Sequence, residues 1–205
     1  MLKIWGRTNS VNVKKALWAI EELGLKYERI EAGMQFGVNK TPEYLRMNPT
    51  GLVPTIDDDG FVLWESHSIV RYLAAKHGAG TLCPADPRVR ADAERWMDWA
   101  FTFQNAMRAV FWGLIRTPSE KRDLKAIEEG RRKSAELLAI PEQVLADKPY
   151  VAGASFTMGD IPLGCEVQRW MRVPMERQVF PSVQAWFERL GTRPAFRKIV
   201  DIPLS

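Results

Sequence analysis

Residues 4–15 read Ile4-Trp5-Gly6-Arg7-Thr8-Asn9-Ser10-Val11-Asn12-Val13-Lys14-Lys15, and the rest of the chain is organised around this stretch. An apolar strand ends in it, a short polar turn follows, and a helix opens directly behind the turn. The helix is indicated by Val13, Leu17 and Ile20, which recur at helical spacing. Its first turn presents unpaired backbone N–H groups and a partial positive charge, so this junction favours an anion.

Small hydrogen-bonding side chains fill the turn before this helix: Thr8, Asn9, Ser10 and Asn12. A hydroxyl at this place, such as that of Ser10, could donate a hydrogen bond to a bound anion. The alternative is that Ser10 only caps the helix, which is among the commonest roles of serine. The turn residues alone leave both interpretations open.

Size and composition are those of an ordinary globular protein. The chain has 205 residues, of which 46% are hydrophobic and 26% charged, enough for one sizeable core or two smaller ones. No stretch approaches the roughly 20 apolar residues of a membrane helix, and the N-terminus lacks the apolar segment of a signal peptide. We therefore expect a cytoplasmic protein with no membrane partner.

Cysteine usage and charge exclude further classes. Cys83 and Cys165 form no CxxC pair, which argues against a disulfide framework, a dithiol redox centre and a zinc site, so no metal is expected. The net charge of +4 is mild. The densest basic cluster, 131–133, directly follows Glu128 and Glu129, as on a solvated helix face. No basic stripe with interleaved aromatic residues is present, so no nucleic-acid partner is expected.

The first 79 residues are predicted to form a domain with the element order βαβ-α-ββα. Helical and alternating patterns, with turn residues between them, give this order. Proline removes a donor N–H, so Pro54 needs an edge or a special geometry within its predicted strand. The predicted strands are 3–5, 27–31, 53–56 and 61–64, the predicted helices are 13–23, 41–45 and 68–76, and a hairpin turn is predicted at 57–60.

The stretch 80–87 is predicted to be a linker, and residues 88–205 are predicted to be entirely helical. Thr157 and Asp160 match a capping box at the start of one of these helices. Pro141 predicts a kink or a break, because proline inside a helix costs about 3 kcal/mol. The predicted helices of this part are 89–113, 119–138, 161–171, 181–190 and 194–200.

Four segments together resemble the cytosolic glutathione transferase family, over essentially the whole chain. The N-terminal segment is similar to the serine-type motif of phi- and theta-like bacterial members. The resemblance implies an α+β fold, with a thioredoxin-like domain (1–79) followed by an all-α domain (88–205). The segments are Ser10-Val11-Asn12-Val13, Asn48-Pro49-x-Gly51-x-Val53-Pro54, Glu65-Ser66-x-Ser68-Ile69-x-Arg71-Tyr72-Leu73 and Thr157-x-x-Asp160.

The resemblance also implies a site for glutathione as co-substrate. Ser10 is implied to hydrogen-bond the sulfur and favour the thiolate, with Thr8, Asn9 and Asn12 as auxiliary candidates. The Val53 backbone, beside a cis Pro54, is implied to pair with the cysteinyl part of glutathione. The γ-glutamyl end is implied to meet Glu65 and Ser66, and the glycyl carboxylate Lys40. Capping remains the alternative for Ser66, and a solvated surface position the alternative for Lys40.

Two residues depart from the phi-like pattern. Leu52 stands where those members usually carry glutamine, and Asn39 where they usually carry histidine. Both differences remove or alter contacts with glutathione. Asp160 is expected to be structural, as a capping carboxylate.

The function implied by the resemblance is that of a homodimeric transferase that activates the glutathione thiol for attack on a hydrophobic electrophile. Arg108, Phe111 and Trp112, toward the end of the first long helix of the second domain, are the candidate electrophile contacts, although aromatics at helical spacing are more often core residues. The alternatives are a glutathione-dependent peroxidase or disulfide reductase, and a non-catalytic binding protein that keeps the fold.

Overall fold

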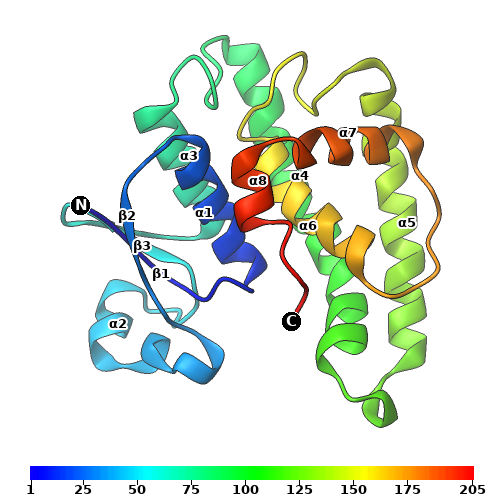
Figure 1. Cartoon of the computed structure of the whole chain (residues 1–205), viewed down its shortest axis with the longest axis horizontal. Coiled ribbons are helices and arrows are strands. Elements are labelled where there is room, and N and C mark those ends of the chain that lie inside the picture. The colour runs from blue at the N-terminus through cyan, green and yellow to red at the C-terminus, as the bar shows by residue number, and fades with distance from the viewer. The chain divides into compact units, whose positions relative to one another are not determined.

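The computed structural model describes residues 1–205, and its one sheet lies in the first 83 of them. The strand order is β2-β1-β3-β4, with β1 and β2 parallel and the other pairs antiparallel (Figure 1). The register aligns Trp5 of β1 with Thr55 of β3, and Thr55 with Trp64 of β4. The strands are β1 Leu2–Trp5, β2 Tyr27–Ile30, β3 Thr55–Asp58 and β4 Phe61–Trp64.

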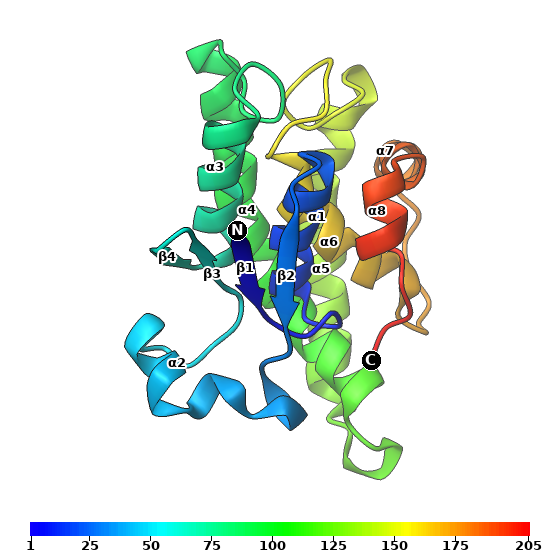
Figure 2. The same ribbon diagram turned by 60° about the vertical axis from the view of Figure 1, so that its left-hand side comes forward.

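Three α-helices accompany this sheet: α1 Val11–Glu22, α2 Pro42–Met47 and α3 Ser66–His77. The helices α1 and α3 pack against each other, whereas α2 lies apart from that pair in both views (Figures 1 and 2). Two short 3-10 turns, Met34–Phe36 and Val38–Lys40, precede α2. The core of the domain consists of the apolar faces of α1 and α3 and the central strands, with fully buried residues that include Ile4, Val13, Leu17, Ile20, Ile56, Ile69 and Leu73.

The hairpin between β3 and β4 is tighter than predicted. The strand β3 begins at Thr55, one residue after Pro54, which has no N–H to give to a ladder. Only Asp59 and Gly60 form the turn, both with positive φ (51° and 93°), as a two-residue hairpin turn requires. The predicted four-residue turn was therefore wrong, because the first two aspartates are strand residues.

The helices of the chain's second unit pack around α4. The chain divides into compact units at 83/84, within the stretch 80–87. The helix α4 contacts α5 and α6, and α5 contacts α7. Fully buried Trp170 and Trp186 lie in this core. The elements are α4 Pro87–Phe111, a π-helical turn Trp112–Arg116, a 3-10 turn Ser119–Lys121, α5 Leu124–Asp147, α6 Asp160–Arg172, α7 Pro181–Gly191 and α8 Pro194–Ile199.

Pro141 does not break the chain's second long helix. The helix α5 runs through it to Asp147, so the predicted end near Leu138 was wrong. Pro141 is buried, and the next residue, Glu142, accepts hydrogen bonds from the backbone N–H groups of Ser182 (3.1 Å) and Val183 (2.9 Å) at the start of α7. Packing against α7 thus stabilises the helix beyond Pro141 enough to offset the missing hydrogen bond.

Asp160 is a fully buried carboxylate that joins three segments. It accepts hydrogen bonds from Thr157 N–H (2.9 Å), Val151 N–H (3.1 Å) and Trp186 Nε1–H (2.9 Å). Removal from water raises the pKa of Asp160 to about 6. The Thr157 hydroxyl accepts from Gly159 N–H at 3.3 Å, and Asp160 is the first residue of α6 rather than its third. Asp160 therefore has a structural role, as predicted, but its hydrogen bonds reach Val151 and Trp186 as well as Thr157.

The fold shows neither a membrane-spanning helix nor a cluster of metal ligands. None of the helices combines the length and apolar character needed to cross a bilayer. No three His, Cys, Asp or Glu side chains are grouped so as to hold a metal ion.

Candidate functional site

Three loops meet at one end of the sheet in the first domain. β1 ends at Trp5, β3 begins at Thr55 and β4 ends at Trp64, and these three residues are aligned across the sheet. The segments that continue from them therefore leave the sheet side by side. The loop after β1 carries Ser10, the loop before β3 carries Val53 and Pro54, and the segment after β4 carries Glu65 and Ser66.

Ser10 occupies the N-cap position of α1 without capping it. Its backbone is extended (φ −85°, ψ 123°), and its carbonyl accepts the first helical hydrogen bond, from Lys14 N–H at 2.9 Å. Its side chain makes no hydrogen bond to the helix. The interpretation of Ser10 as only a cap is therefore wrong. A buried hydroxyl stands instead beside the unpaired N–H groups of the first turn.

Gly6 sets how closely the turn approaches the helix. A Cβ atom at Gly6 would lie 2.4 Å from Cγ2 of Val13, so a larger residue there would force the Val13 side chain or the turn to move. The turn is thus held against α1 by a close contact between the backbone and a side chain. Thr8 is exposed and Asn9 is half-buried in this turn.

Asn12 contacts a buried lysine that the sequence analysis did not single out. Lys15 has no exposed surface, and its Nζ donates to Asn12 Oδ1 at 3.1 Å and lies 3.2 Å from Nε2 of His67. His67 is the second residue of α3, directly after Ser66. The side chain of one buried lysine therefore joins α1 to the start of α3. The sequence did carry a signal for Lys15. It stands four positions after the apolar Val11, so the two share a helix face, and α1 buries that face.

The loop before β3 is held in shape by polar side chains below it. Nδ2 of Asn48 donates to Leu52 O and Thr55 Oγ1, each at 3.0 Å. The hydroxyl of Tyr44 donates to Leu52 O at 2.5 Å and lies 2.7 Å from Thr55 Oγ1. The peptide bond between Val53 and Pro54 is cis. The backbone N–H and C=O of Val53 make no hydrogen bond in the chain, so both are available to a ligand.

Lys40 and Asn39 both approach this loop at Gly51. A Cβ atom on Gly51 would lie 2.8 Å from Nζ of Lys40, so the ammonium group rests against the glycine, although the residue is exposed. Nδ2 of Asn39 donates to Gly51 O at 2.6 Å. Asn39 thus shapes the loop, and the exposed Leu52 (63%) presents an apolar side chain beside it.

Glu65 has an unusual backbone conformation. Its φ of 71° lies in a region that non-glycine residues rarely adopt, at a cost of about 1–3 kcal/mol. It precedes α3, and its exposed carboxylate does not cap that helix. Ser66, the first helical residue, is buried (3% exposed), and its hydroxyl has no partner in the chain. Strain of this kind often marks a functional site, and here it lies beside free donors at a helix N-terminus.

The electrophile candidates in the second domain are separated by the structure. Arg108 and Trp112 line a cavity of about 440 Å³, together with Asn105 and Ala109. Phe111 is buried (1% exposed) and does not line this cavity. Trp112 is 46% exposed and begins the π-helical turn. Such turns often occur at functional sites.

The first domain thus carries a βαβ-α-ββα sheet fold of the thioredoxin-like class, with polar groups gathered at the N-termini of two helices, and an all-helical domain follows it. Residues 1–75 match the family model of the glutathione S-transferase N-terminal domain, and residues 103–194 match that of the C-terminal domain. The chain belongs to the glutathione S-transferase family.

Individual relatives agree with this assignment. Glutathione S-transferase GstB of Escherichia coli (strain K12) is 45% identical over 208 residues, covering 100% of both chains. Glutathione S-transferase 3 of Zea mays is 33% identical, covering 99% of this chain and 95% of the relative. A theta class glutathione S-transferase from Xanthomonas axonopodis pv. citri, solved with glutathione bound, has a TM-score of 0.96 and 48% identity, covering 100% of this chain and 99% of the relative.

The predicted family and fold class are confirmed by these matches. The serine-type assignment and the roles of the individual site residues stay predictions.

Proposed function

We propose that this protein is a glutathione S-transferase that binds glutathione at the three loops of the first domain and activates its thiol for attack on a hydrophobic electrophile. The observation that carries the proposal is the hydroxyl of Ser10, which is buried at the N-terminus of α1 and does not cap it. A glutathione-bound relative with 48% identity supports glutathione as the co-substrate.

Ser10 would stabilise the thiolate of glutathione. Its hydroxyl donates a hydrogen bond to the sulfur anion, and the partial positive charge at the start of α1 acts in the same direction. Both effects lower the thiol pKa and raise the fraction of the nucleophilic thiolate at neutral pH. The thiol proton passes to solvent as the thiolate forms. The sulfur then forms a bond to the electrophilic carbon, and the bond from that carbon to its leaving group, a halide in an aromatic halide, breaks with both electrons going to the leaving group. Asn12, Asn9 and Thr8 are the auxiliary polar groups of this turn.

The remaining residues would hold the backbone and the two ends of the tripeptide. The Glu65 carboxylate suits the γ-glutamyl ammonium, and the Ser66 hydroxyl with the first N–H groups of α3 suits its carboxylate. The unpaired backbone groups of Val53 suit the cysteinyl amide, as at a strand edge, with Pro54 next to them. Lys40, resting on Gly51, supplies a cation for the glycyl carboxylate.

In the second domain, Arg108 and Trp112 are proposed to contact the electrophile, because they line one cavity. Phe111 is assigned to packing, because its ring is buried. A homodimer in the cytoplasm, expected from the family resemblance, is part of the proposal. Light scattering after size-exclusion chromatography and fractionation of the producing cells test the two points.

The central test compares wild type with Ser10→Ala and, as the matched control, Ser68→Ala, an exposed serine of the same domain. Glutathione binding is measured by calorimetry, and conjugation to an aromatic halide is followed across pH. We expect Ser10→Ala to keep glutathione binding but to lose about 10²–10³ in kcat at neutral pH, the range for removing one donor to a reacting anion. Its rate profile should move to higher pH, whereas Ser68→Ala should match wild type.

Other outcomes would contradict parts of the proposal. An unchanged rate in Ser10→Ala would transfer the thiol contact to Thr8, Asn9 or Asn12. Glutathione binding without conjugation by wild type would favour a peroxidase or a disulfide reductase, which hydroperoxide and mixed-disulfide assays would identify. No glutathione binding at all would favour a non-catalytic protein that keeps the fold.

A further inference from the structure

The carbonyl oxygen of Leu52 accepts hydrogen bonds from two buried side chains. Tyr44, on α2, donates its hydroxyl proton to this oxygen at 2.5 Å, and Nδ2 of Asn48 donates to it at 3.0 Å. Tyr44 and Asn48 are each 1% exposed, so water has little access to compete for these bonds. A carbonyl oxygen has two lone pairs, and both are occupied here.

Thr55 completes this network and sets the direction of the Tyr44 hydroxyl. The single hydroxyl proton of Tyr44 goes to Leu52 O, so the 2.7 Å contact between Tyr44 Oη and Thr55 Oγ1 is a bond that Thr55 donates. Nδ2 of Asn48 gives its second proton to Thr55 Oγ1 at 3.0 Å. Thr50 fixes that amide, because its N–H and its hydroxyl both donate to Asn48 Oδ1, at 3.0 and 2.6 Å. Each donor of the network therefore has one defined acceptor.

The Leu52 carbonyl and the Val53 N–H belong to one rigid peptide unit. This peptide bond is trans, so its C=O and N–H point in opposite directions within one plane. Because the carbonyl is held toward Tyr44 and Asn48, the N–H is turned to the opposite side. That N–H makes no hydrogen bond within the chain, and Val53 is partly exposed. The network thus presents a backbone donor to a ligand.

The side chain of Leu52 adds no further donor or acceptor. It has no polar atom, although it is 63% exposed. At this position the chain therefore offers a ligand only backbone groups. A donor whose orientation is already fixed loses less entropy on binding than a mobile one, so the hold on the carbonyl contributes to affinity.

We propose that Tyr44 is a positioning residue for glutathione, which holds the Leu52–Val53 peptide so that the Val53 N–H points to the cysteinyl carbonyl of the ligand. The inference rests on the proposed function, whose glutathione site it extends to a buried side chain. The hydroxyl is the group that acts. Phenylalanine would fill the same space, but it would leave Leu52 O with one donor and the Thr55 hydroxyl without its acceptor.

The first test measures how firmly this peptide is held when no ligand is present. The order parameter of the Val53 N–H is determined by ¹⁵N relaxation in wild type, Tyr44→Phe and the control Tyr72→Phe, which also removes one hydroxyl from the first domain, a donor to Asp58 at 2.7 Å. We expect about 0.85, the value of rigid backbone, in wild type and Tyr72→Phe, and a lower value in Tyr44→Phe. Equal values in all three would show that Asn48 alone holds the carbonyl and would overturn the inference.

The second test measures the binding of S-methylglutathione by calorimetry. This ligand has no thiol, so its affinity reports the backbone contacts and not thiol activation. We expect Tyr44→Phe to raise its Kd by about three- to ten-fold, the range for one neutral hydrogen bond. Tyr72→Phe should match wild type. An unchanged Kd in Tyr44→Phe would overturn the inference.

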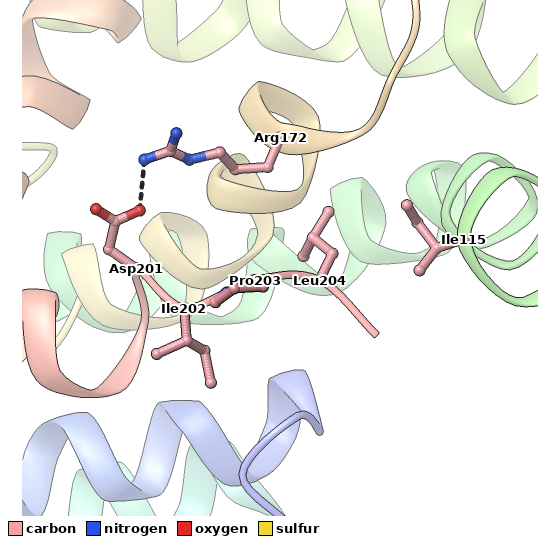
Figure 3. A pocket seen from close by; sticks show the side chains of 6 residues that line it. All are labelled: Ile115, Arg172, Asp201, Ile202, Pro203 and Leu204. Carbon is pink, nitrogen blue, oxygen red and sulfur yellow. Dashed lines mark hydrogen bonds and ion pairs between the residues drawn. The ribbon is translucent and has the colours of Figure 1, made fainter.

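A control in the second domain shows what a small loss of stability does to binding. Arg172→Gln breaks the ion pair that Arg172 of α6 makes with Asp201 at 2.6 Å, beside a cavity of about 400 Å³ (Figure 3). An exposed ion pair and a neutral hydrogen bond contribute similar free energies, so this variant is matched to Tyr44→Phe in stability. Its Kd for S-methylglutathione should equal that of wild type.

An ester analogue identifies the contact that Tyr44 affects. In this analogue the Cys–Gly amide of S-methylglutathione is replaced by an ester, whose carbonyl is a weaker acceptor. The ratio of the two Kd values should be smaller in Tyr44→Phe than in wild type, because a donor that is poorly oriented gains less from the better acceptor. Loss of the glycyl N–H is common to both proteins and cancels in this cycle. The same ratio in both would show that the Val53 N–H is placed equally well without Tyr44.

Kinetics separate positioning from a merely structural role. At saturating glutathione, the kcat of Tyr44→Phe with an aromatic halide and its pH profile should equal those of wild type, while KM for glutathione rises. A merely structural loss would instead lower kcat through the fraction of folded protein and leave KM unchanged, and that result would overturn the inference.

The failure of this inference can be told from that of the proposed function. If S-methylglutathione binds as expected but Ser10→Ala conjugates as fast as wild type, the assignment of thiol activation to Ser10 is wrong and the role of Tyr44 stands. If wild type conjugates glutathione and Tyr44→Phe binds S-methylglutathione as wild type does, only the role of Tyr44 is wrong. No binding of either ligand by wild type would overturn both.

Discussion

Replacing Asp160 by asparagine tests how the second domain tolerates a buried charge. The pKa of Asp160 is raised by burial to about 6, above the ordinary value of 3.8. A carboxylic acid whose pKa is higher in the folded state binds its proton more tightly there. Its contribution to stability is therefore fully present below the unfolded pKa of 3.8 and is lost as the pH rises through 6.

The magnitude follows from the difference between these two values. One pKa unit corresponds to about 1.4 kcal/mol, so the full effect is about 3 kcal/mol, of which about 2.4 kcal/mol falls between pH 4 and pH 7. Asparagine does not titrate, and its NH₂ group would face a donor such as the N–H of Thr157. That mismatch gives a pH-independent cost of about 1–3 kcal/mol.

The assay is urea unfolding of wild type, Asp160→Asn and the control Asp147→Asn at pH 4, 5, 6 and 7. Asp147 is an exposed aspartate at the end of α5, so its variant should follow the wild type at every pH. The stability advantage of wild type over Asp160→Asn should shrink by about 2.4 kcal/mol from pH 4 to pH 7. An advantage that stays constant or grows over this range would refute the argument that burial dominates the environment of this carboxylate.

Three further substitutions each test one local feature, and the free energy of unfolding in urea is measured for each. Glu65→Gly should raise the free energy of unfolding by about 1 kcal/mol, because relief of the strained φ exceeds the entropic cost of glycine. It should also weaken glutathione binding measured by calorimetry. A lower free energy of unfolding would show that the backbone of Glu65 is not strained. Glu142→Ala should lower the free energy of unfolding by about 2–3 kcal/mol, because two N–H groups at the start of α7 lose a charged acceptor. A loss below about 0.5 kcal/mol would show that water replaces the carboxylate as acceptor. Gly6→Ala should cost about 1–3 kcal/mol through its clash with Val13, and a neutral result would mean that the turn shifts freely.

Much of the fold could be predicted because its signals are local. The apolar spacing of Val13, Leu17 and Ile20 fixes a helix from its own residues, and Gly24, with a φ of 63°, ends it where predicted. The segments around Val53 and Glu65 could likewise be found as sequence patterns. These features depend on residues close together in the chain, so a short stretch of sequence is enough to identify each of them.

Whether each site residue is buried, and which groups it contacts, depended on segments that are distant in the sequence. The sequence places Ser10 at the N-cap position but does not tell whether its hydroxyl hydrogen-bonds to the helix. In the structure the hydroxyl makes no such bond. Phe111 and Trp112 are adjacent in the sequence, yet one ring is buried and the other is 46% exposed, because successive helical residues point about 100° apart. The sequence alone favours a surface position for Lys15. Only the fold shows that its side chain is buried beside His67, which lies 52 residues later in the chain.

The sequence by itself thus determined which elements form and which segments carry the chemistry. The register that aligns Trp5, Thr55 and Trp64 was decided only in three dimensions, and it gathers the three loops of the candidate site. Packing also decided that α5 continues through Pro141. The physical reason is that periodicity and turn propensity are short-range, whereas burial and hydrogen-bond partners are set by residues that only the folded chain brings together.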